Sequence, residues 1–525
     1  MIIARAYHLI SRFFADENLT KKAYLNVINN VLTYIVKLGV QFVITPMMVS
    51  GLGTFVYGLW QVINRTIGYI SPASGRPTDA LLWIIARNQS SNNFEQKRQY
   101  MTSAIIVWAI FLPLMVVCGS VIAWFIPAWF DIPFEYISMV RITALILIAG
   151  MVMQVISELP QSILRGENLG YKRMGLTIFL TVIGGLGTWA ALALNTGLIG
   201  IAAMSVFTTV LNACLYVILA RKYIPWFGVS RPPRSQVKEF LGLSGWFMGW
   251  NLVWTSMFAT DVVLLGLLTS VEMVTVYTLT KYVPEILISI TQFLVAGVGP
   301  GLGGIIGRGE IKRAADLRGE MLAISWLVGT AVGVAVVIWN NVFLNLWVGA
   351  DKFAGSLASL LIVVAVFQFI MIQNDAGVID VTLRMSKKVI LGTISILVTV
   401  AVGILFVNTL HLDIIGITLA LILGRLILSI GYPMIVGNAL QISFKSQLRS
   451  AFRPFVITAL MLVLGYQIGM LIPGDIFSGL SGWVTFFLAA AATFLLAIFF
   501  AFFFGLTSRQ RSSMLQRVKI VLHPR

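Results

Sequence analysis

The sequence predicts an all-α polytopic membrane protein of about fourteen transmembrane helices, arranged as two pseudo-symmetric six-helix bundles followed by a C-terminal helix pair. Three observations support this fold class. The 525 residues are 58% apolar and only 11% charged, whereas soluble proteins are roughly 45–50% apolar and about 25% charged. Apolar stretches of about 20 residues, the length that crosses a bilayer as a helix, recur along the chain. Lys and Arg residues fall mainly in alternate connections between these stretches.

The predicted spans follow one another with short connections. Each is expected to be helical, because backbone polar groups inside a bilayer must be satisfied within the segment itself. The fourteen spans lie near 24–49, 54–86, 101–127, 136–160, 175–194, 196–220, 240–268, 273–298, 319–343, 354–379, 389–409, 412–438, 451–472 and 480–505. The predicted organisation is a cytoplasmic tail at 1–22, a first six-helix bundle at 23–222, a linker at 223–239, a second bundle at 240–438, a helix pair at 439–505 and a basic tail at 506–525.

The distribution of basic residues predicts the orientation in the membrane. The N-terminal tail, every second connection and the C-terminal tail carry most of the 37 Lys and Arg residues. The opposite connections hold one base, Lys352, against several acids, Asp131, Glu135, Glu272, Asp351, Asp413 and Asp475. Because basic loops stay in the cytoplasm, both termini are predicted to be cytoplasmic, as an even number of spans requires. No cleavage signal follows the first span, so we expect a multi-pass protein of the inner (cytoplasmic) membrane.

Composition excludes several classes of function. The three histidines (His8, His411 and His523) are scattered, and Cys118 and Cys214 lie inside apolar runs, so no metal site, cofactor site or disulfide framework is expected. The net charge of +17 is spread over loops instead of forming one patch, so nucleic acid is not an expected partner. We therefore expect a protein that is not an enzyme and holds no cofactor.

A weak internal repeat appears at an offset of about 220 residues, as in transporters built from two halves. Residues 52–65 read LGTFVYGLWQVINR, and residues 271–285 read VEMVTVYTLTKYVPE. At this offset Tyr57 matches Tyr277 and Arg98 matches Arg318; at 219, Gln154, Leu164 and Arg165 match Gln373, Leu383 and Arg384. The basic connections recur at the same steps, which supports two related bundles.

Ionisable side chains inside the spans are the candidate functional residues, because each costs about 2.5–3.5 kcal/mol to insert. The deep bases are Lys37, Arg65, Arg76, Lys281 and Arg425. We predict that they bind an anionic headgroup. The deep acids are Asp79, Asp261, Glu285, Asp375 and Asp380, of which Asp261, Glu285 and Asp79 are candidates for binding a coupling ion. A further base, Arg141, lies near the outer end of its span, where it is expected to snorkel to the interface.

Two of these bases have an acid on the same helix face. Arg76 and Asp79 stand three residues apart, and Lys281 and Glu285 stand four apart, so each pair is predicted to form a local salt bridge. Such a pair either serves a transport site or only lowers the cost of insertion, and the sequence leaves both interpretations open. Lys37 and Arg425 have no acid within four residues, which favours a ligand as their partner.

The second predicted span contains the run YISPASGRPTDA at 69–80, with Pro72, Gly75 and Pro77 within six positions. This run cannot continue as a regular helix. Irregular backbone at membrane depth is tolerated where it is buried or lines a hydrated cavity, so the run is predicted to face a central path. A proline kink with no role in transport is the alternative.

Two segments carry a resemblance to a known family: LGTFVYGLW at 52–60 and LRGENLGYKR at 164–173. With the order of spans and loop charges, the chain resembles Wzx-type polysaccharide flippases of the polysaccharide transporter family, within the superfamily that also holds MATE exporters and the lipid II flippase. The resemblance implies a V-shaped pair of six-helix bundles working by alternating access. It also implies, as substrate, a lipid-diphosphate-linked oligosaccharide, the repeat unit of O-antigen lipopolysaccharide, capsule or exopolysaccharide.

The resemblance leaves more than one function open. A MATE-like drug or cation antiporter would favour deep acids over deep bases, and here there are five of each. A lipid II type flippase is compatible with the same pattern. A non-transporting membrane scaffold is compatible with the basic loops, although it does not explain costly intramembrane charges. The partners implied by the resemblance are the lipid-linked oligosaccharide, membrane lipids and proteins of polysaccharide synthesis such as a polymerase.

Overall fold

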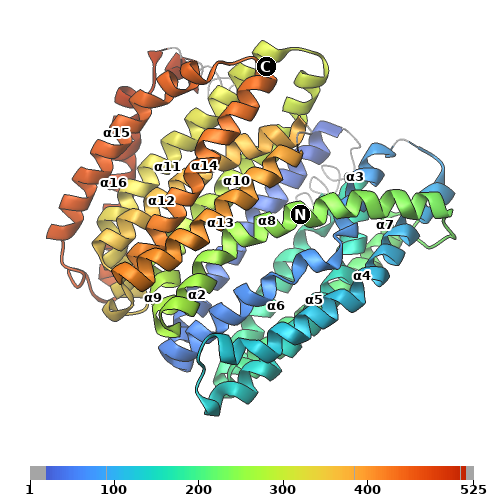
Figure 1. The fold of residues 1–525 in the computed structure, drawn as a ribbon, viewed down its shortest axis with the longest axis horizontal. Coiled ribbons are helices and arrows are strands. Elements are labelled where there is room, and N and C mark those ends of the chain that lie inside the picture. Colours follow the sequence, from blue (N-terminus) through green and yellow to red (C-terminus); the bar gives the residue numbers. More distant parts are fainter. Residues whose placement is uncertain (1–18, 90, 383–384, 509, 513, 516–525) are drawn as a thin grey trace, which may run out of the picture. The chain divides into compact units, whose positions relative to one another are not determined.

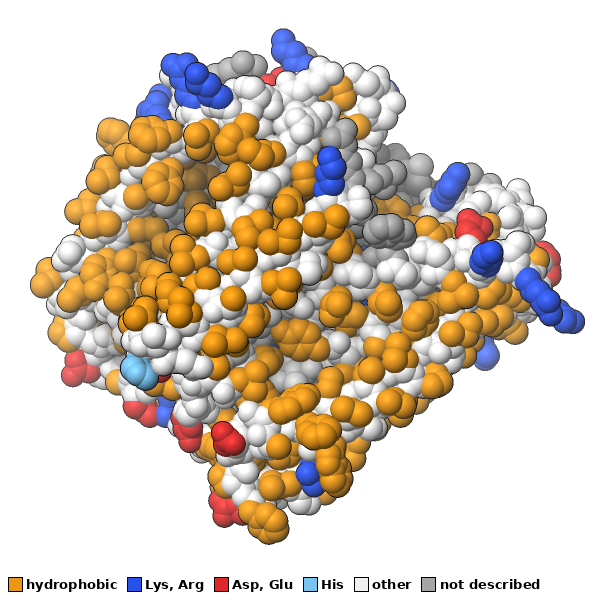
Figure 2. Space-filling model, viewed as in Figure 1, with side chains coloured by type: hydrophobic (Ala, Val, Ile, Leu, Met, Phe, Trp, Pro, Cys, Tyr) orange, Lys and Arg blue, Asp and Glu red, His pale blue; other side chains and the backbone are white. Residues whose placement is uncertain are grey.

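The computed structural model describes residues 19–89, 91–382, 385–508, 510–512 and 514–515. Most of the predicted N-terminal tail and part of the basic C-terminal tail lie outside these residues. All regular structure in the described part of the chain is helical, which confirms the predicted fold class. Twelve of its helices are long and apolar enough to cross a membrane. On the face drawn in Figure 2, apolar side chains cover the helices, as expected for surfaces that contact lipid.

The chain divides into two compact units. Unit 1 contains the described residues up to Val56 and Thr66–Leu252, and unit 2 contains Tyr57–Arg65 and the described residues from Val253 onward. The helices that begin in unit 1 are α2 (Leu19–Gly68), η1 (Ser71–Ser74), α3 (Pro77–Arg87), α4 (Phe94–Trp129), α5 (Phe134–Gly166), η2 (Gly170–Arg173), α6 (Met174–Ala193), α7 (Gly197–Tyr223) and α8 (Arg234–Leu268). Helices α2 and α8 thus contribute residues to both units.

Unit 2 holds the later helices, several of which run side by side in Figure 1. They are α9 (Val271–Thr280), α10 (Tyr282–Gly307), α11 (Ile311–Trp347), η3 (Ala350–Lys352), α12 (Ser356–Val381), α13 (Met385–Leu410), α14 (Asp413–Leu440), α15 (Phe444–Leu471), α16 (Gly479–Phe500) and a short π-helical turn, η4 (Ala501–Gly505). The fifteen α-helices of the described residues agree with about fourteen spans when α2 is divided at Gly53 (φ 79°, ψ 167°), its second part is counted with α3, and α9 is counted with α10.

The predicted span 54–86 is not one helix. Helix α2 ends at Gly68, and α3 begins only at Pro77. Between them the backbone turns through left-handed conformations at Gly75 (φ 72°) and Arg76 (φ 48°). A Cβ atom at Gly75 would overlap the ring of Phe111, so glycine is required there for space as well as for φ. The predicted interruption of the helix at this run is therefore confirmed.

The predicted span 273–298 is also interrupted, at Lys281 between α9 and α10. The cause lies in the sequence, because Pro284 has no N–H to donate to the carbonyl of Thr280, four residues before it. Asn340 of α11 satisfies that carbonyl instead, with its Nδ2 at 3.0 Å. A single proline thus sets the position at which Lys281 leaves the regular helix.

In unit 1, helices α3, α4 and α7 pack around α5. The hydrophobic core of unit 1 includes Leu81, Ile85, Ile163 and Phe240, all fully buried. The segment between α7 and α8 is attached to this unit by hydrogen bonds on Trp226: its indole nitrogen donates to Glu167 and its carbonyl accepts from Arg98. The start of α8 is therefore held by unit 1.

In unit 2, α11 is the central helix and packs against α10, α12, α15 and α16. The last two predicted spans are thus joined to α11. Close packing there uses glycine, since a Cβ atom at Gly469 would meet the backbone of α11 and one at Gly505 would overlap Trp326. The indole nitrogen of Trp326 also donates to Thr458 of α15 at 2.8 Å. The side chains described next come from the second part of α2 and from α8, α9, α10, α12 and α14.

Candidate functional site

The candidate site is a group of charged side chains inside unit 2, centred on Asp261 of α8. Its Oδ2 lies 2.5 Å from Nζ of Lys281 and accepts a hydrogen bond from the hydroxyl of Tyr277 at 2.7 Å. Its other oxygen accepts from the backbone N–H of Val262 at 2.9 Å. Asp261 is 1% exposed. Three donors therefore compensate this carboxylate for its loss of water, as a buried charge requires.

A second acid in the group, Glu285 of α10, pairs with Arg65 of α2. Nη2 of Arg65 lies 3.2 Å from Oε1 of Glu285, and Nη1 donates to the carbonyl of Phe258 at 3.4 Å. Lys281 is farther from Glu285, at 3.9 Å. The predicted Lys281–Glu285 pair is thus present, but the nearest partner of Lys281 is Asp261, from another helix. The side chains of Arg65 and Glu285 are 29% and 30% exposed, whereas that of Lys281 is 8% exposed.

The third base, Arg425 of α14, is buried and forms no ion pair with any carboxylate of the described residues. Its guanidinium donates to the carbonyls of Ala365 (3.2 Å) and Met257 (3.0 Å) and lies over the ring of Phe369, 4.6 Å from the centroid. Arg425 therefore links α8, α12 and α14. Its charge is stabilised by backbone dipoles and an aromatic face.

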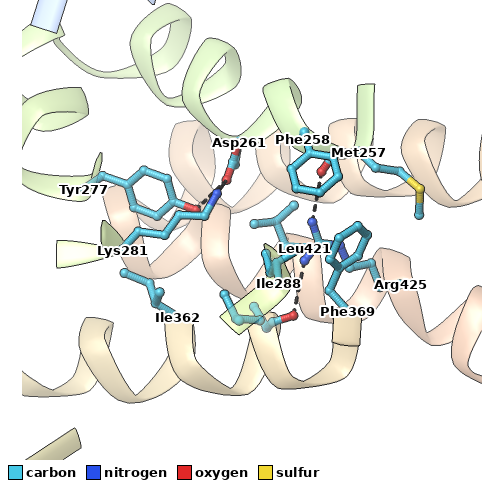
Figure 3. Close-up of a pocket in the computed structure, with 12 residues that line it drawn as sticks. Met257, Phe258, Asp261, Tyr277, Lys281, Ile288, Ile362, Phe369, Leu421 and Arg425 are labelled. Atoms are coloured by element: carbon cyan, nitrogen blue, oxygen red, sulfur yellow. Dashed lines mark hydrogen bonds and ion pairs between the residues drawn. The ribbon is translucent and has the colours of Figure 1, made fainter. Parts of the chain in front are cut away.

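Four of these residues, Asp261, Tyr277, Lys281 and Arg425, line a small cavity, drawn in Figure 3. Asp261, Tyr277 and Lys281 lie at one side of it and Arg425 at the other, with Ile362 and Phe369 among the apolar lining residues. The cavity has room for no more than about one water molecule. Three bases and two acids leave the group with one excess positive charge, in surroundings where charge is costly. An excess positive charge attracts anions and repels cations.

The other predicted site residues belong to unit 1. Nε of Arg76 lies 2.7 Å from Oδ2 of Asp79, which confirms that predicted pair. Thr78, two residues after Arg76, donates its hydroxyl to Glu158 at 3.2 Å. A further acid therefore lies at the start of α3. Lys37 lies on α2 with an exposed side chain. The structure thus brings together five predicted residues within unit 2 (Arg65, Asp261, Lys281, Glu285 and Arg425), whereas Arg76, Asp79 and Lys37 belong to unit 1.

Sequence reasoning misses some residues of these groups. In the sequence, Tyr277 is noted only because it matches Tyr57 in the internal repeat. A tyrosine four residues before an intramembrane lysine could also have indicated a buried hydroxyl donor. Glu158 stands near the end of its predicted span and is absent from the predicted site. Arg318 and Asp375 form a buried bidentate pair at 2.6 and 2.9 Å, and Lys388 pairs with Asp380 at 2.6 Å. These two pairs tie α12 to its neighbours and account for the two remaining deep acids.

The chain shares its fold with solved transporters of the MOP superfamily. The chain is similar to an inward-facing MATE-family multidrug resistance transporter of that superfamily, with 15% identity and a TM-score of 0.61, over 78% of this chain and 99% of that chain. It is similar to the lipid II flippase MurJ in an inward closed conformation, with 12% identity and a TM-score of 0.66, over 91% and 99%. It is also similar to a MOP superfamily transporter from Pyrococcus furiosus, which is described as having a binding pocket of reverse polarity. The identity is 16% and the TM-score 0.58, over 81% of this chain and 97% of that chain.

Neither family models nor curated proteins give a match to this chain. At 12–16% identity the structural likenesses show a shared fold. The predicted resemblance is therefore confirmed for the fold of the superfamily, and its narrower part, the polysaccharide flippase branch, stays a prediction. The apolar helices and this fold together describe a multi-pass membrane protein.

Proposed function

We propose that the protein is an inner-membrane flippase that translocates a lipid-diphosphate-linked oligosaccharide by alternating access. The observation that carries this proposal is the charged cluster of unit 2, in which Arg65, Lys281 and Arg425 outnumber Asp261 and Glu285. A diphosphate headgroup offers several oxygens to guanidinium groups, which bind phosphate with paired hydrogen bonds. The fold shared with the lipid II flippase MurJ supports the proposal.

In this proposal the headgroup first meets the most exposed base of the cluster, Arg65, while Lys281 and Arg425 supply positive potential behind it. Lys37 and Arg76 of unit 1 remain headgroup ligands predicted from the sequence. Outward movement of an anion is favoured by the inside-negative membrane potential, by about 2.3 kcal/mol per charge per 100 mV. Both termini are cytoplasmic, and the glycan is the repeat unit of an O-antigen, capsule or exopolysaccharide.

The second candidate is a drug or cation antiporter, which the likeness to MATE-family transporters favours. A cation substrate would need a free carboxylate. Asp261 already has three donors, and Glu285 is paired with Arg65, so each would first have to lose its partner. The cluster as it stands repels a cation, and we therefore place the antiporter second.

A flipping assay tests the proposal. The purified protein is reconstituted in liposomes with a fluorescent lipid-linked oligosaccharide, and transfer between leaflets is followed by quenching from outside. We expect the rate of flipping with the native protein to exceed that in empty liposomes at least tenfold. The Arg65→Gln variant should lose most of this increase in rate. Transport of a lipophilic cation with no flipping of the lipid would overturn the proposal and support the antiporter.

A further inference from the structure

We propose that Glu285 is the exchangeable partner of Arg65: a phosphate headgroup takes the place of its carboxylate on the guanidinium, and the released Glu285 takes up one proton. This inference rests on the proposed function and assigns the coupling of the same site. It also separates the two deep acids of unit 2, because it makes Asp261 a fixed positioning residue and Glu285 the acid that changes state.

Of the three bases in the cluster, Arg65 is the one that can change its partner. Lys281 is held by Asp261 at 2.5 Å with a side chain only 8% exposed, and Arg425 is held by two carbonyls and an aromatic ring. Arg65 makes longer contacts, at 3.2 Å to Glu285 and 3.4 Å to the carbonyl of Phe258, and is 29% exposed. A phosphate offers a guanidinium two oxygens in the plane of its N–H groups, a better match than the single carboxylate oxygen that it now contacts.

Of the two acids in the cluster, Glu285 is the one that a ligand can release. Asp261 accepts from Lys281, Tyr277 and a backbone N–H and is 1% exposed, so an approaching ligand does not reach it. Glu285 is 30% exposed and uses one oxygen for both of its bases. The ionisable groups that surround Glu285 are Arg65 and Tyr57 on α2, Asp261 on α8, Tyr277 on α9 and Lys281 at the start of its own helix. With Arg65 occupied by phosphate, Lys281 at 3.9 Å is the one base left beside it, and Asp261 already neutralises Lys281.

The charges of the cluster and of the headgroup balance when Glu285 binds one proton. The cluster of Arg65, Lys281, Arg425, Asp261 and Glu285 has a net charge of one positive. A diphosphate diester has two negative charges, so the occupied site has one excess negative charge. An uncompensated charge in such surroundings is costly. One proton on Glu285 restores neutrality. A proton needs no ligand other than the carboxylate of Glu285 itself, so it is the cation that we expect.

The test counts protons during binding. The probe is farnesyl-diphospho-N-acetylglucosamine, a diester with two negative charges, titrated into the detergent-solubilised full-length protein by calorimetry in two buffers of different ionisation enthalpy. We expect the native protein to take up about one proton per bound probe, and its affinity to fall by up to about tenfold per pH unit where Glu285 loses its proton. Glu285→Gln should bind as tightly or more tightly, with no uptake and no pH dependence. Arg65→Gln should bind at least tenfold more weakly.

A matched control is Glu310→Gln. Glu310 is also paired with arginines, at 2.6 Å from Arg308 and 3.0 Å from Arg313, and its side chain is 35% exposed, close to the 30% of Glu285. It lies in the connection before α11, and hydrogen bonds from both arginines lower its pKa, so it stays ionised near neutral pH. This variant should keep native binding and native proton uptake.

The outcomes separate the two claims. Native binding without proton uptake, or uptake that persists in Glu285→Gln, overturns the exchange at Glu285 and leaves the headgroup site standing. If the affinity for the probe is higher in sodium chloride than in choline chloride and no proton is taken up, the coupling cation is not a proton, and that assignment is overturned. Absence of probe binding, or equal binding by the native protein and a folded Arg65→Gln variant, overturns the proposed function itself. Size-exclusion profiles and thermal unfolding establish that each variant is folded.

Discussion

Nη2 of Arg65 lies 3.2 Å from Oε1 of Glu285, and the two residues are 220 positions apart, the offset of the internal repeat. At the same offset Tyr57 and Tyr277 are 5% and 1% exposed. The two halves of the repeat therefore have the same aromatic residue, Tyr57 and Tyr277, but side chains of opposite charge two helical turns later, Arg65 and Glu285. As a result, a base from the first half of the sequence completes the charged cluster of unit 2 and neutralises the acid at its own equivalent position.

The Asp261–Lys281 pair is expected to be essential for stability. Lys281→Gln leaves the buried carboxylate of Asp261 without its base, and removing one partner of a buried ion pair costs about 3–5 kcal/mol. We expect a lower midpoint of thermal unfolding in detergent. The double variant Asp261→Asn with Lys281→Gln should be more stable than Lys281→Gln alone, because no charge is left unpaired. Equal midpoints for the single and double variants would contradict this account.

Gly58 is expected to control the approach of α2 to α9. A Cβ atom there would overlap the carbonyl oxygen of Val271 and lie 2.8 Å from Oγ1 of Thr275. Gly58→Ala should therefore cost about 1–3 kcal/mol by overpacking and reduce flipping, because it moves Arg65 away from Glu285.

The matched control for that substitution is Gly39→Ala, in the same helix. No atom lies within 4 Å of a Cβ built at Gly39, and alanine is the better helix former, so this variant should be as stable as the native protein or more so. Thermal unfolding and flipping assays compare the two variants. A Gly58→Ala protein that behaves like Gly39→Ala would show that the close approach is not required.

The remaining predicted bases are tested by charge and by geometry. Arg76→Lys and Arg425→Lys should retain partial flipping, because charge is kept and the planar fork is lost. Arg76→Gln, Arg425→Gln and Lys37→Gln should nearly abolish flipping while the protein still inserts. The Arg76–Asp79 pair is partly exposed, at 22% and 35%, so losing it should cost no more than about 1 kcal/mol of stability. Full rescue by the double variant Arg76→Gln with Asp79→Asn, or normal flipping in Lys37→Gln and Arg425→Gln, would argue against a headgroup site and for the antiporter.

The orientation in the membrane is tested by single cysteines on a background in which Cys118 and Cys214 are replaced by serine. Cysteines at Arg165 and Lys387 should resist an impermeant thiol reagent in intact cells, and cysteines at Asp131 and Asp475 should react. All four positions are exposed, so a failure to react reports the side of the membrane and not burial. Labelling at Arg165 in intact cells would refute the predicted topology.

Helix positions were predictable from sequence to the extent that hydropathy marks the hydrocarbon core. The structure extends many helices past the predicted ends: α4 begins at Phe94 and α11 at Ile311, where we predicted 101 and 319. Those first turns are polar, so hydropathy excludes them, although helical hydrogen bonding continues beyond the lipid. The helix interruptions at 69–76 and at Lys281 have different causes in the sequence. The first was predicted from two prolines and a glycine, whereas the second depends on Pro284 alone.

The sequence by itself determined the class of fold, the presence of five deep bases and five deep acids, and the local pair of Arg76 with Asp79, because hydropathy, insertion cost and helix periodicity act over at most a few turns. Only the tertiary structure decided that Lys281 pairs first with Asp261, that Arg65 pairs with Glu285, and that Arg425 is satisfied by carbonyls of α8 and α12. These partners come from helices 20 to 220 residues apart. Distance in sequence contains no information on such contacts, because packing of whole helices brings them together.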